Sequence, residues 1–275
     1  MKKLLISSLI LLTFASCSNN EDVLEDVLNE TLYHVEVLTL PEQIIPNKEE
    51  KFEFQIITNN GEIQKVFEIM HEKLMHLVIV RKDLQEFQHL HPTIDPKTGI
   101  ATANITFPTS GPYRMFFEFT PEYQSSITLD IDIGGNTSFQ PQELEISKEA
   151  TQKIGDYEVT YNFPKIIKTN EEIEYSLEVQ KNSQPVTDLE NYLGAKGHSI
   201  ILKEGSLIYV HTHPKNNEDL TFGTNFTEPG KYKIFTQFQH NGKIMRAEYV
   251  VEVVENTDLE KTDSESAPAM NHPGH

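Results

Sequence analysis

Short segments in which apolar and polar residues alternate recur along the chain. Residues 52–56 (FEFQI), 127–133 (ITLDIDI) and 157–161 (YEVTY) alternate with period two, which is typical of strands that bury one face. Turn-forming sequences separate such segments, among them Asn-Asn-Gly at 59–61 and Glu-Pro-Gly at 228–230. The pattern therefore predicts an all-β protein.

The strand pattern occurs twice. Residues 76–92 align without a gap with residues 198–214, and residues 111–119 align with residues 230–238. About seven short strands in each repeat favour two tandem Ig-like or cupredoxin-like β-sandwich domains. The predicted organisation is a signal peptide at 1–16, an acidic tether at 17–30, β-sandwich domains at 31–134 and 150–255, a linker at 135–149 and a disordered tail at 256–275.

Six of the 11 histidines lie at matched positions of the two repeats, in the pattern His-x12-His-x-His-Pro. His89 and His91 are two residues apart on a predicted strand, so they share a face. A hairpin with its loop at 82–85 places His76 opposite His91 and diagonal to His89. Three imidazoles in this arrangement can bind one metal ion. The same construction in the second repeat predicts a cluster of His198, His211 and His213.

The strand period also assigns these histidines to a face. His76 shares its face with Val78 and Val80, and His198 shares its face with Ile200 and Leu202. We expect both histidine clusters to continue an apolar, core-facing stripe at the open end of their hairpins.

The residue types indicate which metal is expected. Imidazole ligands suit copper or zinc, whereas a blue-copper site also needs a cysteine thiolate, and the one cysteine, Cys17, lies in the N-terminal segment. We predict one copper or zinc ion per domain, in two three-histidine sites. The alternative is a non-catalytic structural or interaction protein in which the histidines stabilise the hairpins.

Composition narrows the function further. The chain has 23 Lys and Arg against 42 Asp and Glu, a net charge of −19, which disfavours binding to nucleic acid. It carries no Gly-x-Ser-x-Gly sequence and no glycine-rich phosphate loop. No carboxylate pair stands out as a general acid and base. We therefore expect a binding protein and not an enzyme.

The N-terminus predicts a membrane anchor. Lys2 and Lys3 precede an apolar run at 4–12, which is too short to span a bilayer as a helix and is typical of a signal peptide. The sequence Ala15-Ser16-Cys17 that follows resembles the bacterial lipoprotein signal, or lipobox. That resemblance implies cleavage before Cys17 and lipidation of its sulfur. The expected location is the bacterial cell envelope, at the outer membrane on its periplasmic or surface face, with a metal-transport protein as partner.

The two repeats resemble the exported bacterial YtkA-like or FixH-like domains. The resemblance rests on the His-Leu-His-Pro stretch within residues 76–92 and on the Gly-x-Tyr stretches at 110–113 and 229–232. It implies β-sandwich domains in proteins associated with copper or heavy-metal handling. This chain departs from the family pattern at Ser110, where proline is expected, and at Gly205, where aspartate is expected.

Overall fold

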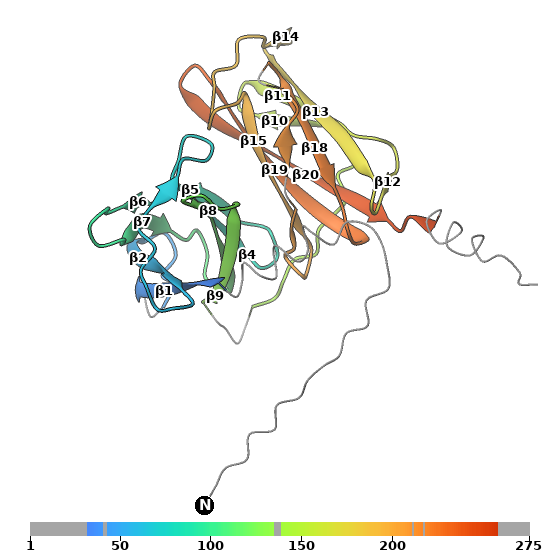
Figure 1. Cartoon of the computed structure of the whole chain (residues 1–275). Coiled ribbons are helices and arrows are strands. Elements are labelled where there is room, and N and C mark those ends of the chain that lie inside the picture. Colours follow the sequence, from blue (N-terminus) through green and yellow to red (C-terminus); the bar gives the residue numbers. More distant parts are fainter. Residues whose placement is uncertain (1–31, 41–42, 135–138, 211, 217, 258–275) are drawn as a thin grey trace, which may run out of the picture.

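The computed structural model describes residues 32–40, 43–134, 139–210, 212–216 and 218–257, which form two β-sandwich domains in tandem (Figure 1). The predicted all-β class and the two tandem domains are confirmed. The predicted signal peptide, the tether with Cys17 and most of the tail lie outside the described residues. Within the described ranges, no helix is long and apolar enough to cross a membrane.

Domain 1 packs a four-stranded sheet, in the order β1-β2-β7-β6, against a five-stranded sheet, in the order β3-β8-β4-β5 with β9 on β8. Alternate residues of β2, such as Phe52 and Phe54, point inward and meet Phe117 of β8. The strands are β1 (Tyr33–Thr39), β2 (Glu49–Thr58), β3 (Phe67–Glu68), β4 (Met75–Arg81), β5 (Phe87–Leu90), β6 (Thr93–Ile94), β7 (Ala101–Thr106), β8 (Tyr113–Pro121) and β9 (Ile127–Ile133).

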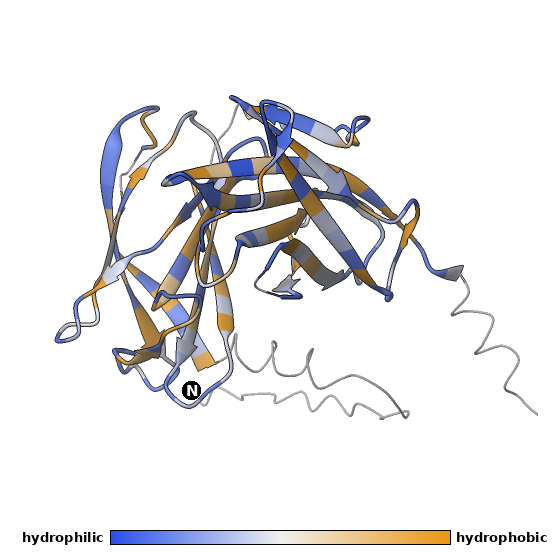
Figure 2. Cartoon of the chain, turned by 90° about the horizontal axis from the view of Figure 1, so that it is seen from above, coloured by the Kyte–Doolittle hydropathy of each residue, from blue (hydrophilic) through white to orange (hydrophobic). Residues whose placement is uncertain are grey.

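Domain 2 repeats this plan. One sheet has the order β10-β11-β13-β18-β17 with β14 on β13, and the other has the order β12-β20-β19-β15-β16. Figure 2 shows the alternation of hydrophobic and hydrophilic residues along the strands. The strands are β10 (Thr151–Ile154), β11 (Tyr157–Asn162), β12 (Ile167–Lys168), β13 (Glu172–Lys181), β14 (Gln184–Pro185), β15 (Gly197–Lys203), β16 (Tyr209–Val210), β17 (His213–Pro214), β18 (Leu220–Asn225), β19 (Gly230–His240) and β20 (Lys243–Val254).

A third hydrophobic cluster joins the two domains. In β4, Leu77 and Ile79 point into the core of domain 1, whereas Val78 and Val80 pack against residues of domain 2. The strand period grouped His76 with Val78 and Val80 correctly. The expectation that this face points into the domain's own core is wrong, because both faces of β4 are buried and the histidine face meets the other domain.

The interface pairs equivalent surfaces of the two repeats. Phe87 stacks on Phe235, with ring centroids 4.3 Å apart and an angle of 15° between the planes. The repeat counterparts of these two residues, Tyr209 and Phe116, also contact each other, at 5.4 Å between centroids. The domains are therefore related across the interface by an approximate two-fold axis, as in an isologous dimer.

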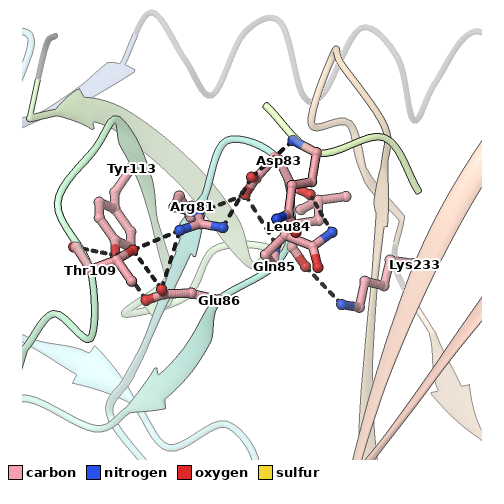
Figure 3. Close-up of polar contacts among 9 residues, drawn as sticks. Arg81, Asp83, Leu84, Gln85, Glu86, Thr109, Tyr113 and Lys233 are labelled. Atoms are coloured by element: carbon pink, nitrogen blue, oxygen red, sulfur yellow. Dashed lines mark hydrogen bonds and ion pairs between the residues drawn. The ribbon is translucent and has the colours of Figure 1, made fainter. Parts of the chain in front are cut away.

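Polar contacts hold the β4–β5 hairpin in place at its loop (Figure 3). The Arg81 guanidinium donates to both carboxylate oxygens of Asp83, at 2.8 and 3.1 Å, and to Thr109 at 2.7 Å. From domain 2, the Lys233 ammonium donates to the Leu84 carbonyl oxygen at 2.9 Å. These bonds fix the loop of the hairpin against its own domain and against domain 2.

We expect Phe87→Ala to lower the free energy of unfolding by about 3 kcal/mol, because it removes a ring buried between the domains. It should also split a single unfolding transition into two, since the domains lose much of their shared core. Urea unfolding followed by circular dichroism measures both effects. Tyr123→Ala, which removes an aromatic side chain that is 88% exposed, is the matched control. Equal effects of the two substitutions would contradict this account of the interface.

Candidate metal centre

The β4–β5 hairpin brings three of the predicted histidines together. Its register pairs Leu77 with Leu90 and Val78 with His89, as a loop at 82–85 predicts. The ring centroids of His76 and His89 are 5.2 Å apart, those of His76 and His91 are 5.0 Å apart, and those of His89 and His91 are 4.9 Å apart. His76 is fully buried, and the other two rings are half-buried.

The second domain contributes His198 to the same cluster. Its ring stacks on that of His76, with centroids 5.6 Å apart and planes 9° apart, and lies 5.1 Å from the ring of His89. One ring nitrogen each of His76, His89 and His198 lie within 4.8 Å of one another. The approximate two-fold axis thus brings the equivalent residues His76 and His198 side by side, so a histidine of the second predicted triad lies next to the first triad.

The remaining histidines of the second repeat are only partly described. Val210 of β16 pairs with Ile201 of β15, in the register that the loop at 204–207 predicts. The backbone of His213 lies in β17 and pairs with Gly223. His211 and the side chain of His213 lie outside the described residues, so their predicted role stays a prediction.

His71 joins the cluster, although the repeat pattern does not select it. Its ring lies 5.3 Å from that of His198 and 6.0 Å from that of His76. His71 and Glu72 form a two-residue turn with φ values of 47° and 65°. Domain 2 has the same turn at Leu193 and Gly194, so the turn recurs but the histidine does not. A search restricted to matched histidines therefore misses His71.

The hydrogen bonds of His76 and His89 determine which ring nitrogens carry protons. His76 Nε2 lies 3.1 Å from the Met70 carbonyl oxygen, which can only accept, so this nitrogen carries the proton. His89 Nδ1 lies 2.8 Å from the Gln237 amide oxygen of domain 2, so this nitrogen donates as well. In the neutral rings, His76 Nδ1 and His89 Nε2 are then both bare, and they face each other at 2.9 Å.

The lone pairs of two nitrogens at this distance repel each other unless a proton or a metal cation lies between them, or one ring adopts its other tautomer. A shared proton is one solution, but burial lowers the pKa of His76 to about 4 and that of His89 to about 3. A rotated Gln237 amide is a second solution, because its NH2 group would then donate to His89 Nδ1. A metal cation bound to both bare nitrogens is the third.

His91 is a further candidate ligand. Among the described residues, its Nε2 atom has no hydrogen-bond partner, although the atom itself is buried. Burial also lowers the pKa of His91 to about 4, so its ring is neutral at neutral pH. With Thr93 and Asn104 it lines a surface hollow of about 350 Å³.

A buried carboxyl group lies beside these rings. Glu118 of β8 is the cross-strand partner of His76, and its side chain is only 4% exposed. The Tyr209 hydroxyl of domain 2 donates to Glu118 Oε2 at 3.5 Å. Burial raises the pKa of Glu118 to about 7. Glu118 belongs to no motif of the sequence, so sequence reasoning missed it.

The family match covers both domains. The family described as "Domain of unknown function (DUF8832)" matches residues 30–133 and again residues 151–255. The chain belongs to this family. The match to DUF8832 does not test the resemblance to YtkA-like or FixH-like domains, which stays a prediction. A comparison with curated proteins found no match.

Several solved structures show low similarity to the chain. The Escherichia coli adhesin FdeC is 13% identical, with 82% of this chain and 64% of that chain covered and a TM-score of 0.26, so the chain spans under two thirds of the adhesin chain. Domains 5–6 of the S-layer protein SbsC are 11% identical, with 82% and 99% covered and a TM-score of 0.25. The D00-D0 domain of intimin is 11% identical, with 80% and 100% covered and a TM-score of 0.24. Similarities of this size do not indicate a shared function.

The lowered histidine pKa values predict how stability depends on pH. Histidines of the unfolded chain titrate near 6.5, so between about pH 6.5 and 4 the unfolded chain binds more protons than the folded chain. The free energy of unfolding of the metal-free protein should therefore fall as the pH is lowered through this window. The raised pKa of Glu118 has the opposite effect on the pH dependence of stability, but it comes from one group, whereas three histidines contribute to the fall.

Urea unfolding in the presence of a chelator at several pH values measures this slope. In His76→Gln the slope of the free energy of unfolding against pH should decrease by about 1.4 kcal/mol per pH unit, which corresponds to the uptake of about one proton. The control is His34→Gln, which changes an exposed histidine of β1 and should leave the slope as it is. A slope that is the same in His76→Gln and in the wild type would contradict a lowered pKa of His76 in the folded chain.

Proposed function

We propose that this protein binds a transition-metal ion between its two domains, through His76, His89 and His198. The observation that carries the proposal is that His76 Nδ1 and His89 Nε2 face each other at 2.9 Å while each ring's other nitrogen lies within hydrogen-bond distance of an oxygen. With the protons on those other nitrogens, both facing nitrogens are free to bind an ion. In metal sites, a ligating histidine almost always donates its second N–H to such an acceptor, which orients the ring.

The distances suit a metal ion after small side-chain movements. Metal–nitrogen bonds of about 2.0–2.1 Å allow two nitrogens on one ion to lie at most about 4.2 Å apart. The candidate nitrogens lie within 4.8 Å of one another. Side-chain rotations that move these nitrogens by less than about 1 Å therefore bring all three within bonding distance of one ion. His91, whose Nε2 atom has no hydrogen-bond partner among the described residues, borders the same space and is the candidate for a fourth ligand.

The donor set favours copper(II) or zinc(II). Imidazole suits both ions, whereas a thioether ligand would favour copper(I). The sulfur of Met70 accepts hydrogen bonds from Ser126, at 3.2 Å, and from Thr120, at 3.8 Å, and Met75 is buried in the core of domain 1. Neither thioether therefore supports a copper(I) site at this cluster.

The biological role that fits such a site is metal sequestration or delivery. A ligand from each domain means that the ion bridges them, so binding stabilises the paired arrangement and release accompanies its loosening. If Cys17 is lipidated, as its sequence context suggests, the protein acts at the bacterial cell envelope, where a transport protein would take or supply the ion. Binding without catalysis remains our proposal.

A structural role for the histidines is the second candidate. His89 donates to Gln237 across the domain interface, and His76 donates to a turn of its own domain, so both rings already contribute hydrogen bonds. In this interpretation the chain is a non-catalytic structural or interaction protein, and the cluster joins the two domains without an ion.

Isothermal calorimetry of the chain without an affinity tag tests the proposal. We expect one zinc or copper(II) ion to bind per chain, because the cluster is shared between the domains. His198→Gln should weaken binding by roughly 100-fold or more, since it removes a ligand and not just a supporting group. The matched control, His34→Gln, changes an exposed histidine of β1 and should bind as the wild type does.

Two outcomes would contradict the proposal. One is a wild-type chain that binds neither ion at micromolar concentration. The other is a His198→Gln variant that binds metal as the wild type does but melts at a lower temperature both with and without chelator, which is the result that the structural role predicts. Two ions per chain would instead favour one site in each domain.

A further inference from the structure

The approximate two-fold axis assigns a counterpart to each residue at the interface. In domain 1, His76 of β4 pairs across the sheet with Glu118 of β8. In domain 2, the equivalent His198 of β15 pairs with Gln237 of β19. Glu118 and Gln237 therefore occupy the same position of the two repeats, each beside the central histidine of its own domain.

The two positions differ by one charge. Gln237 accepts a hydrogen bond from His89 of the opposite domain at 2.8 Å. Glu118 points to the same interface and accepts a hydrogen bond from Tyr209 of the opposite domain at 3.5 Å. An amide at one position suffices to orient a histidine, so the carboxyl group at the other position offers something that an amide cannot, which is negative charge.

A divalent ion held by three neutral imidazoles brings two positive charges into a buried site. Burial of a charge is costly unless an opposite charge lies nearby. Two carboxyl side chains are buried among the described residues, Asp83 and Glu118. Asp83 lies in the hairpin loop beside Arg81, whereas Glu118 lies next to His76, and the Cβ atoms of such a cross-strand pair are about 5 Å apart.

We propose that Glu118 supplies the negative charge that makes this centre select divalent over monovalent cations. The inference rests on the proposed metal site and adds to it a residue that sets specificity without being a ligand. Because the Coulomb energy is proportional to the charge of the ion, the carboxylate favours a doubly charged ion twice as strongly as a singly charged one.

The test compares zinc(II) with silver(I), two ions that imidazole binds, by calorimetry on the wild type and on Glu118→Gln. We expect about a tenfold loss of zinc affinity and about a threefold loss of silver affinity, so that the logarithm of the first loss is twice that of the second. Glu122→Gln, which removes an exposed carboxylate just beyond the end of β8, is the matched control and should change neither affinity.

A charge-swap variant separates charge from packing. Glu118→Gln combined with Gln237→Glu moves the carboxylate to the equivalent position beside His198, where it still accepts from His89. We expect zinc affinity to return to within about threefold of the wild type.

The possible results are distinguishable. Equal losses for the two ions, or unchanged zinc affinity in Glu118→Gln, would overturn this inference while leaving the metal site in place. A double variant that binds zinc no better than Glu118→Gln would also overturn it. A wild-type chain that binds neither ion would overturn the proposed function, and the inference with it.

Discussion

The packing of β4 against domain 2 is the contact on which the rest of the structure depends. In a lone β-sandwich the outer face of such a strand meets water, but here Val78, Val80 and Phe87 are buried against Ile200, Leu202 and Phe235. Because the buried surfaces are repeat equivalents, a contact between two residues recurs between their counterparts, and a residue at the axis meets its own counterpart. Among the described residues, histidines of both repeats consequently share a cluster, in which His76 stacks on His198.

Much of this architecture could be predicted from the sequence. The period-two alternation and the repeated His-x12-His-x-His-Pro pattern indicate the strands and the duplication. The hairpin register that places His76 near His89 and His91 follows from a four-residue loop and needs only local geometry. These features depend on neighbours along the chain, which is why the sequence shows them.

The interface could not be predicted in the same way. Residues 77–80 (LVIV) are apolar on both faces, so the strand period separates two faces without telling which one meets the domain's own core. His71 has leucine as its repeat counterpart, and Gln237 and Glu118 belong to no sequence motif. Their importance comes from contacts between domains about 100 residues apart in sequence, for which the local pattern contains no signal.

The central claim is that His76 and His89 turn their bare nitrogens toward a shared ion. Nitrogen-15 NMR of the imidazoles, recorded before and after one equivalent of zinc, tests it most directly. The account predicts that zinc-loaded His76 is protonated only at Nε2 and His89 only at Nδ1, with His76 Nδ1 and His89 Nε2 shifted to metal-bound positions. Spectra that zinc leaves unchanged, or a proton on His89 Nε2 in the loaded protein, would contradict it.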